Sequence, residues 1–332
     1  MTAPPHEARA SELRVSVALA TRNGSQFLEK QLASILAQTR MPDELVVSDD
    51  DSSDDTLAIA RRVVGSTVPL TVLVNTPPLG VTGNFERAVT ACTGDLIALS
   101  DQDDVWPANR LATMIAEFEA RPDLLLLHSD ARLVDADGAP LGLTLFDALE
   151  VSDQEKSLIH SGSAFDALLR RNVVTGATTV FRRELLATTL PFPQGWVHDE
   201  WLAIVASAVG RIDVVDDVLL DYRQHGANQI GAQRLSIAGK VRRVLSEPRT
   251  ERNARLEANF ALLADCLDEL DGVSPERRAA AREKAEHERV RNAYPASRWS
   301  RLGPILRERA TGRYALSAQG SMDIVRDLLQ PV

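Results

Sequence analysis

In the stretch Leu96–Pro107, LIALSDQDDVWP, four apolar residues and a serine run directly into a cluster of carboxylates. The apolar run predicts a buried strand, which ends at Asp101, Asp103 and Asp104. Like charges held this close repel one another, so such a cluster usually requires a cation unless its members splay into solvent. The stretch therefore favours an α/β sheet that carries an acidic ligand site at the end of a strand.

Strands and helices are predicted to alternate on both sides of this stretch. Apolar runs indicate the strands 13–20, 44–50, 70–75, 95–100 and 123–130. Helical spacing of apolar residues indicates the helices 26–38, 54–64, 84–91 and 108–120. A β-α-β-α order of this kind predicts a mainly parallel central sheet between helices.

The pattern becomes mixed after the fifth predicted strand. We expect a hairpin over 132–142, a helix over 153–170, a loop over 172–183 and a helix over 199–209. Ala, Arg, Glu and Leu dominate the rest of the chain, so residues 236–332 are predicted to be mostly helical.

These patterns predict three parts. Residues 1–12 are expected to form a disordered lead, and 13–235 the domain that contains the sheet. Residues 236–332 are expected to form a C-terminal helical extension.

Composition limits the classes of protein to which the chain can belong. The chain has 332 residues, 44% of them apolar and 25% charged, which is ordinary for globular proteins. Its two cysteines, Cys92 and Cys266, form no disulfide framework, so we expect a reducing compartment. No apolar run approaches the roughly 20 residues that a spanning helix needs.

Charge is unevenly distributed along the chain. Residues 1–235 carry 19 Lys and Arg against 33 Asp and Glu, whereas residues 236–332 carry 18 against 14. The acidic body argues against a nucleic-acid partner. The basic end has two interpretations, namely helices that pack on the catalytic domain or a second subunit, and a surface near anionic lipid. We favour packing, with weak peripheral association left open.

Acidic groups follow three predicted elements at the edge where open parallel sheets bind ligands. They are SDDDSSDD (48–55), the cluster at 101–104 and WVHDEW (196–201). Asp54 and Asp55 could equally cap the next helix. The dinucleotide and P-loop glycine motifs are both missing from the sequence.

The pattern Asp101-Gln102-Asp103-Asp104-Val105 also fits the D-x-D-x-[TV] motif of haloacid-dehalogenase-type phosphatases, with Asp101 as nucleophile. That motif is expected after the first strand, and here it follows the fourth, so this interpretation ranks second. A non-catalytic protein that binds nucleotides or carbohydrates is the other alternative.

Several ordered segments together resemble family 2 glycosyltransferases of the GT-A fold, and within them a rhamnosyltransferase-like bacterial branch. The segments are VSVALATRNGSQFLEKQLASILAQT (15–39), LVVSDDDSSDDTLAIA (45–60), GDLIALSDQDDVWPANRL (94–111) and LDYRQHGANQIGA (220–232). The ending GRYALSAQGSMDIVRDLL (312–329) resembles the tail of that branch.

The resemblance implies a divalent ion, Mn²⁺ or Mg²⁺, that bridges the diphosphate of a nucleotide-sugar. Asp103 matches the direct metal ligand, and Asp101 matches a contact to the ribose or the metal side, with Gln102 beside it. His225 and Arg223 belong to a late motif that approaches the metal or the diphosphate. One or two carboxylates plus substrate phosphates commonly hold such an ion.

The resemblance also implies that 13–235 is a catalytic domain, with a nucleotide-binding half at about 13–105 and an acceptor half at about 106–235. The first half is expected to contain a nucleotide pocket. Asp50 matches the residue that contacts the pyrimidine base, and Asp51 replaces the usual glycine after it. Arg22 stands where relatives often have an aromatic residue, and its planar guanidinium can stack on a base. The other implied nucleotide contacts are Ala20, Thr21, Asn23, Gly80 and Asn84.

Asp199 matches the family's catalytic base at a helix N-terminus, and Glu200 remains an alternative. Displacement at the anomeric carbon needs such a carboxylate to take the proton of the acceptor hydroxyl. Thr175 and Gly176 resemble a loop between donor and acceptor. Trp106, Trp196 and Trp201 are candidate sugar platforms, although buried core is the commoner place for tryptophan.

The expected function is inverting transfer of a sugar, with dTDP-L-rhamnose suggested as donor by the resemblance. The expected acceptor is a saccharide or a polyprenyl-linked precursor of a cell-surface polysaccharide or glycolipid. We expect a cytoplasmic protein that works at or near the inner face of the cell membrane. A homodimer is left open.

Overall fold

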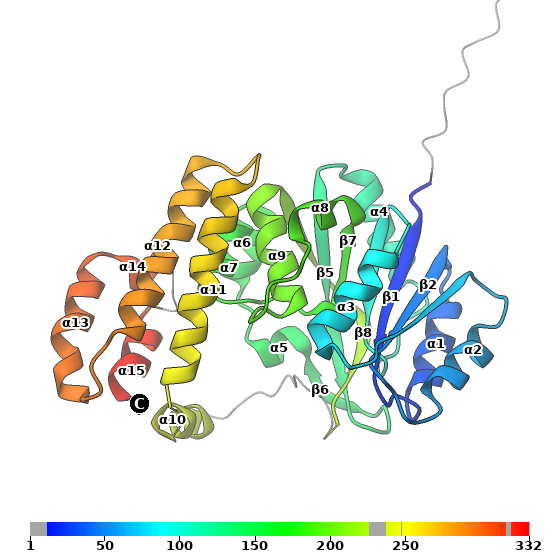
Figure 1. The fold of residues 1–332 in the computed structure, drawn as a ribbon, viewed down its shortest axis with the longest axis horizontal. Coiled ribbons are helices and arrows are strands. Elements are labelled where there is room, and N and C mark those ends of the chain that lie inside the picture. The colour runs from blue at the N-terminus through cyan, green and yellow to red at the C-terminus, as the bar shows by residue number, and fades with distance from the viewer. Residues whose placement is uncertain (1–11, 226–236, 247, 317–319, 332) are drawn as a thin grey trace, which may run out of the picture.

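A mixed eight-stranded sheet forms the centre of the computed structural model, which describes residues 12–225, 237–246, 248–316 and 320–331 (Figure 1). The strand order is β3-β2-β1-β4-β7-β5-β6, and β8 pairs with β5. The strands are β1 Val15–Thr21, β2 Glu44–Asp49, β3 Leu70–Val74, β4 Leu96–Ser100, β5 Leu124–Val134, β6 Pro140–Thr144, β7 Thr179–Arg182 and β8 Arg211–Arg223.

Helices surround the sheet and form the C-terminal end of the described chain (Figure 1). Those of the sheet-containing part are α1 Leu28–Leu36, α2 Thr56–Val64, α3 Gly80–Ala91, α4 Arg110–Ala120, α5 Leu145–Leu149, α6 Asp153–His160, α7 Ala164–Arg170, α8 Leu186–Thr189 and α9 His198–Val209. The C-terminal ones are α10 Ile237–Ser246, α11 Thr250–Glu269, α12 Pro275–Asn292, α13 Arg298–Ala310, α14 Arg313–Leu316 and α15 Ser321–Leu329. Two short 3₁₀ turns are η1 Gly176–Thr178 and η2 Arg183–Leu185.

The prediction of a mainly parallel sheet with helices on both faces is confirmed. Strands β3, β2, β1 and β4 pair in parallel, as do β5 and β8. Alternate residues of β1 enter different cores, because Val17 and Leu19 belong to one apolar cluster and Ala18 to the other. This period of two is what a strand covered by helices on both faces requires.

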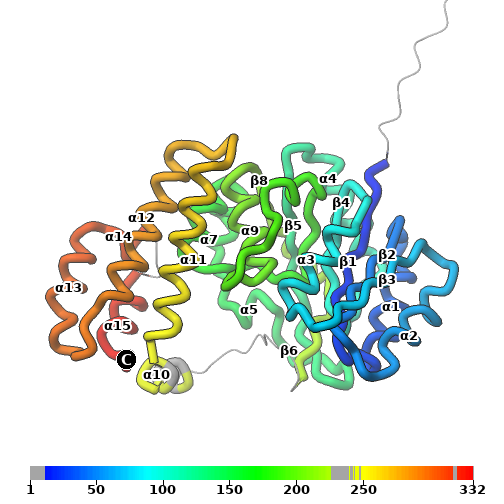
Figure 2. Tube along the Cα trace, in the orientation of Figure 1, coloured from blue at the N-terminus to red at the C-terminus, as the bar shows by residue number. Residues whose placement is uncertain are grey.

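The C-terminal helices share the core of the sheet-containing part. Phe260, Leu263 and Leu267 of α11 belong to the same apolar cluster as Trp196 and Trp201. The interpretation that these helices pack on the rest of the chain is therefore confirmed for α11. Figure 2 shows α13 at the end of the long axis opposite α1 and α2.

The region after β5 differs most from the sequence prediction. The hairpin over 132–142 is confirmed by the antiparallel pairing of β5 and β6. The single helix predicted over 153–170 is wrong, because α6 and α7 are separated by a turn in which Gly162 has φ +83°. The loop predicted over 172–183 is also wrong, since it contains η1 and β7.

Two strands escaped prediction for identifiable reasons. Strand β7 has only four residues, and it becomes a strand by antiparallel pairing with β4 and β5, a contact that local sequence cannot encode. In β8, exposed acids interrupt the apolar pattern at positions 216 and 217. Residues 1–11, which make up most of the predicted lead, and 226–235 of the predicted catalytic domain lie outside the described residues.

Charged side chains are buried where α12 and α15 meet. The Arg291 guanidinium is 1% exposed and binds Asp327 through Nε at 2.7 Å and Nη2 at 2.9 Å. Glu288 and Asp323 also face it, at 3.1 and 3.5 Å. A buried charge is tolerated only with such partners, so this network fixes how α15 docks.

Replacing Asp327 should therefore destabilise the fold. Asp327→Ala leaves Arg291 without its closest partner, and we expect the free energy of unfolding to fall by about 3–5 kcal/mol in urea titrations. The exposed pair Arg282–Asp268, at 2.6 Å, provides the matched control. Asp268→Ala should leave the unfolding midpoint almost unchanged, and an equal loss in both variants would contradict this account.

Candidate active site

The carboxyl ends of β1, β2 and β4 meet at one edge of the sheet, because these strands run parallel side by side. They deliver Thr21, Asp49 and Asp101 to that edge. The N-terminus of α9 adds Asp199, and residues following β8 add His225. Segments far apart in sequence thus bring acidic and imidazole groups together.

Asp49 and Asp50 are buried and organise the loops around them. Asp49 accepts hydrogen bonds from the hydroxyls of Thr21, at 2.9 Å, and Ser52, at 2.6 Å. Asp50 accepts from the backbone N–H groups of Leu79, at 2.7 Å, and Gly80, at 3.0 Å. A carboxylate at the first N–H groups of a helix is favourable, which explains why α3 begins at Gly80 and not at the predicted residue 84.

Asn84 and Gly80 lie where α3 meets this edge. The Asn84 amide donates to the Thr21 carbonyl at 3.1 Å and accepts from Asn75 at 2.9 Å. Gly80 has φ +76°, a conformation that glycine adopts without strain. Asp51 has φ +64° and occupies the left-handed turn for which relatives are expected to use glycine.

Gln102 links the β4 loop to the β1 loop. Its side-chain oxygen accepts from Arg22 N–H at 2.9 Å, and its amide nitrogen donates to the Arg22 carbonyl at 3.1 Å. A Cβ on Gly24 would lie 2.2 Å from the Gln102 side-chain oxygen, so a larger residue there would displace the Gln102 amide. Ala20 is half-buried and Thr21 is buried, whereas the Arg22 and Asn23 side chains are exposed.

Four carboxylates interact at the site. Burial and the charges of Asp103 and Asp199 raise the pKa of Asp101 to about 7. Burial, together with Asp103 and Asp101, also raises the pKa of Asp104 well above its usual range. The same charges and burial raise the pKa of Tyr222. This concentration of negative potential favours binding of a cation.

Asp103 and His225 form the pair best suited to hold that cation. The Asp103 Oδ2 and His225 Nε2 atoms are 2.7 Å apart, and the Phe27 ring stacks on the imidazole with centroids 4.8 Å apart. Carboxylate oxygen and imidazole nitrogen are both suitable Mn²⁺ ligands. In the described part of the chain no cluster of three or more metal-binding side chains occurs, so phosphates would complete the coordination.

The Arg223 guanidinium lies among carbonyl oxygens and supports the Asp103 loop. Its Nε donates to the Asp103 carbonyl at 2.7 Å, and Nη1 donates to the carbonyls of Asp135, at 3.2 Å, and Ala136, at 2.9 Å. Its backbone N–H donates to Asp104 Oδ1 at 3.0 Å. Arg223 therefore has a structural contact with the loop that carries Asp103, and its predicted contact to the donor stays a prediction.

Asp199 is fixed in the first turn of α9. Its carboxylate accepts from the backbone N–H groups of Gly176, at 2.7 Å, and Glu200, at 2.8 Å. A Cβ on Gly176 would lie 3.3 Å from Asp199 Oδ2 and 3.0 Å from His198 Nε2, so glycine permits the approach. Thr175 precedes Gly176 and shapes the turn by accepting from Thr178 through its carbonyl.

The pKa of Glu200, which lies beside Asp199, is also shifted. Burial and the charge of Asp199 raise its pKa to about 7, against the opposing effect of Arg255 from α11. The acid pair therefore lies where the sheet-containing part meets the C-terminal helices.

The tryptophans are buried in the core, and a place for Trp106 and Trp201 beside the donor–acceptor pocket stays a prediction. They are 3% and 2% exposed. The Arg110 guanidinium covers the Trp106 ring at 4.5 Å, and Trp201 Nε1 donates to the Thr189 carbonyl at 2.9 Å. Trp196 is also buried and donates to the Asn259 carbonyl.

Sequence reasoning missed several residues that support the site. His198 is buried and stacks on Phe85 with centroids 4.0 Å apart, directly beside Asp199. Phe27 lies under both His225 and Arg223. Ring stacking between distant segments leaves no local sequence signal, although His198 does precede Asp199 in the same short motif.

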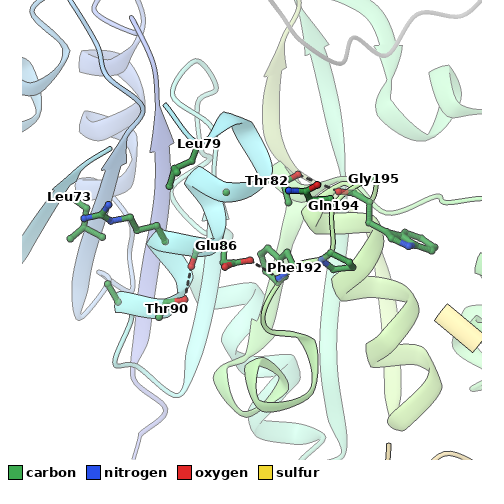
Figure 3. Close-up of a pocket in the computed structure, with 13 residues that line it drawn as sticks. Leu73, Leu79, Thr82, Glu86, Thr90, Phe192, Gln194 and Gly195 are labelled. Atoms are coloured by element: carbon green, nitrogen blue, oxygen red, sulfur yellow. Dashed lines mark hydrogen bonds between the residues drawn. The ribbon is translucent and has the colours of Figure 1, made fainter. Parts of the chain in front are cut away.

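An open pocket of about 770 Å³ lies outside the carboxylate cluster, between α3 and the loop before α9 (Figure 3). Leu73, Leu79 and Phe192 contribute apolar surface to it. The Glu86 carboxylate accepts from the Phe192 N–H at 2.5 Å, which fastens this loop to α3. Among the candidate site residues, Trp196 lines this pocket, and the carboxylates and His225 do not.

Comparison with known proteins identifies the family. The model of the family described as "Glycosyl transferase family 2" matches residues 16–188. The chain belongs to glycosyl transferase family 2. The matched range contains strands β2 and β4 and nearly all of β1, whose carboxyl ends form the acidic edge. This membership removes the phosphatase alternative, in which Asp101 was the nucleophile.

Two curated relatives name a donor. The chain is 34% identical over 195 residues to the UDP-Glc:alpha-D-GlcNAc-diphosphoundecaprenol beta-1,3-glucosyltransferase of Escherichia coli, covering 58% of this chain and 69% of that protein. It is 33% identical over 102 residues to a dTDP-rhamnosyl transferase of Shigella flexneri, covering 29% and 35%. The chain spans 66% and 59% of the length of two uncharacterized relatives.

Solved structures share the fold. The mannosyltransferase of Pyrobaculum calidifontis, in complex with GDP-Man and Mn²⁺, superposes with a TM-score of 0.56 at 21% identity. The match covers 95% of this chain and 79% of that one. The predicted GT-A-type fold, with a parallel core and C-terminal helices, is confirmed.

The raised pKa of Asp101 predicts a pH-dependent stability. Between pH 4 and 7 the folded state retains a proton that the unfolded state has lost, so the contribution of Asp101 to stability falls as pH rises. We compare the free energies of unfolding of Asp101→Asn and wild type in the presence of chelator. The difference should shift in favour of the variant by about 2 kcal/mol between pH 5 and pH 8. Urea unfolding at both pH values measures this, and a pH-independent difference would contradict it.

Proposed function

We propose that this protein is an inverting, metal-dependent glycosyltransferase, of the hexosyltransferase class, that uses a nucleotide-sugar donor. The observation that carries the proposal is the convergence of Asp101, Asp103, Asp199 and His225 at one sheet edge. Asp103 and His225 suit binding of a metal-bound diphosphate, and Asp199 suits a catalytic base. Family membership supports the same reaction class.

Asp103 and His225 would hold the divalent ion, Mn²⁺ or Mg²⁺. When bound, the ion acts as a Lewis acid that offsets the charge gathered by the departing nucleoside diphosphate. Arg223 keeps the Asp103 backbone in place, and Phe27 limits the orientations of the His225 ring. Contacts within the protein thus orient both proposed metal ligands.

The nucleotide would lie along the ends of β1 and β2. Asp50 remains the proposed base contact, because a carboxylate offers about four acceptor positions and the three bonds from Asn75, Leu79 and Gly80 leave one more. Gln102 holds Arg22 at the rim, where its guanidinium is free to stack on a base. Asn84 is buried and supports this pocket through the Thr21 carbonyl.

Asp199 is the proposed general base. The acceptor oxygen would bond to the anomeric carbon, the bond from that carbon to the diphosphate would break, and Asp199 would take the hydroxyl proton. The N–H groups of Gly176 and Glu200 orient the carboxylate without covalent participation. Because the pKa of Glu200 is about 7, this residue is the competing candidate.

We propose dTDP-L-rhamnose as the first donor to test and UDP-glucose as the second. The Shigella relative supports the former over a short match, and the E. coli relative supports the latter over a longer one. The proposed acceptor is a saccharide or polyprenyl-linked precursor of a cell-surface polysaccharide or glycolipid, met at the cytoplasmic face of the membrane. No helix among the described residues is long and apolar enough to cross a bilayer.

Replacing the proposed base should separate binding from chemistry. Asp199→Asn should retain donor affinity within about twofold while kcat for sugar transfer falls by about 10²–10⁴, because only proton removal is lost. Calorimetry with the nucleotide and a transfer assay with both donors measure the two quantities.

Glu200→Gln is the matched control, since it removes the adjacent carboxylate in the same helical turn. We expect it to retain most of the transfer rate. If Glu200→Gln abolishes transfer and Asp199→Asn does not, the two roles must be exchanged. If both variants transfer sugar normally, the assignment of the base to this turn is wrong.

A further inference from the structure

Helix α13 is oriented with apolar residues outward and charged residues inward. Trp299, Leu302 and Leu306 are 85%, 41% and 57% exposed, and their spacing of three and four places them on one face. Arg301 and Glu308, on the opposite side, are at most 3% exposed. An amphipathic helix on a protein surface normally has the reverse arrangement.

Buried hydrogen bonds hold α13 in this orientation. Glu308 accepts from the Arg313 guanidinium at 2.7 Å and contacts His287 Nδ1 at 2.6 Å. The Arg301 guanidinium donates to the carbonyl oxygens of Pro295, Ala296, Asp327 and Gln330. Turning the apolar face inward would break these bonds and leave buried charges unpaired, so the exposed face is a fixed feature of the fold.

Helix α15 repeats the arrangement. Met322, Val325 and Leu329 are exposed at helical spacing, whereas Asp323 and Asp327 are buried. Both helices belong to the C-terminal end of the molecule (Figure 1). Exposed apolar side chains that gather on neighbouring helices indicate a surface that contacts a membrane or another molecule.

The charges around the α13 apolar face have one sign. Arg298 and Arg309 lie on one side of Trp299, Leu302 and Leu306, and Arg307 lies on the other. All three arginines are exposed, and the single acid of α13, Glu308, is buried. An apolar stripe with cations at both margins matches the acyl region and phosphates of an anionic bilayer.

We propose that the α13 face, formed by Trp299, Leu302 and Leu306 with its flanking arginines, lies on the surface of an anionic phospholipid membrane. Tryptophan favours the boundary between headgroups and acyl chains, and arginine binds lipid phosphate. The acidic residues 1–235 would be repelled by such a membrane, and α13 lies at the far end of the long axis from α1 and α2 (Figure 2). The inference goes beyond sugar transfer and does not depend on the donor.

A second copy of the chain fits this face less well. A two-fold contact would place α13 against the same helix of the partner, as isologous interfaces do. Its exposed arginines, three per copy, would then face three others with no exposed acid on α13 to balance them. Anionic lipid removes this repulsion.

Co-sedimentation of the full chain with vesicles tests the proposal. Vesicles of phosphatidylcholine with about one third phosphatidylglycerol should bind the protein at least about tenfold more tightly than pure phosphatidylcholine, and salt should weaken the binding. The double variant Trp299→Ser/Leu306→Ser should lose about tenfold or more in affinity, because both side chains would enter the bilayer. Because both side chains are exposed, the variant should keep the wild-type thermal midpoint.

Two exposed apolar residues far from α13 provide the control. Leu141 and Val74 are 48% and 44% exposed, and Leu141→Ser/Val74→Ser should bind vesicles as wild type does. Failure of wild type to bind anionic vesicles, or equal losses in both double variants, would overturn the proposal. So would a homodimer in sedimentation velocity that Trp299→Ser/Leu306→Ser converts to monomers. Transfer to a soluble acceptor should be unchanged by these variants, which separates this test from that of the proposed function.

Discussion

Mutual repulsion of carboxylates at the carboxyl edge of the sheet is the constraint on which the site depends. Asp101 and Asp103 come from the loop after β4 and Asp199 from α9, and the charges of the latter two help raise the pKa of Asp101 to about 7. The fold does not relieve this repulsion by moving the groups apart. It places His225 against Asp103, and in the proposed function a cation supplies the remaining compensation.

Much of the acidic edge could be predicted because its signals are local. The apolar run of β4 followed by charged residues, and the alternation of strands and helices, indicated the sheet and the place where Asp101 and Asp103 emerge. The structural contacts of Arg223 and of the tryptophans could not be predicted, because they join residues over long sequence separations. Arg223 binds the Asp103 carbonyl 120 residues away, and β7 exists only through its neighbours in the sheet.

Buried charges have different consequences at the two ends of the molecule. At the sheet edge, carboxylates without enough cations create a ligand site. Around α12, α13 and α15, Arg291, Arg301 and Glu308 have protein partners and therefore fix how these helices pack. Because burying an unpaired charge is costly, the helices keep these contacts, and the apolar residues of α13 remain exposed.

The most direct test of the account is metal-dependent nucleotide binding, measured as a thermal shift with dTDP, UDP, GDP and ADP in Mn²⁺. A ligand that binds only the folded state must stabilise it, so dTDP or UDP should raise the midpoint in Mn²⁺. Chelator, or the substitution Asp103→Ala, should remove most of that shift. A shift that survives both changes, or no shift with any nucleotide, would contradict a metal–diphosphate site at Asp103 and His225.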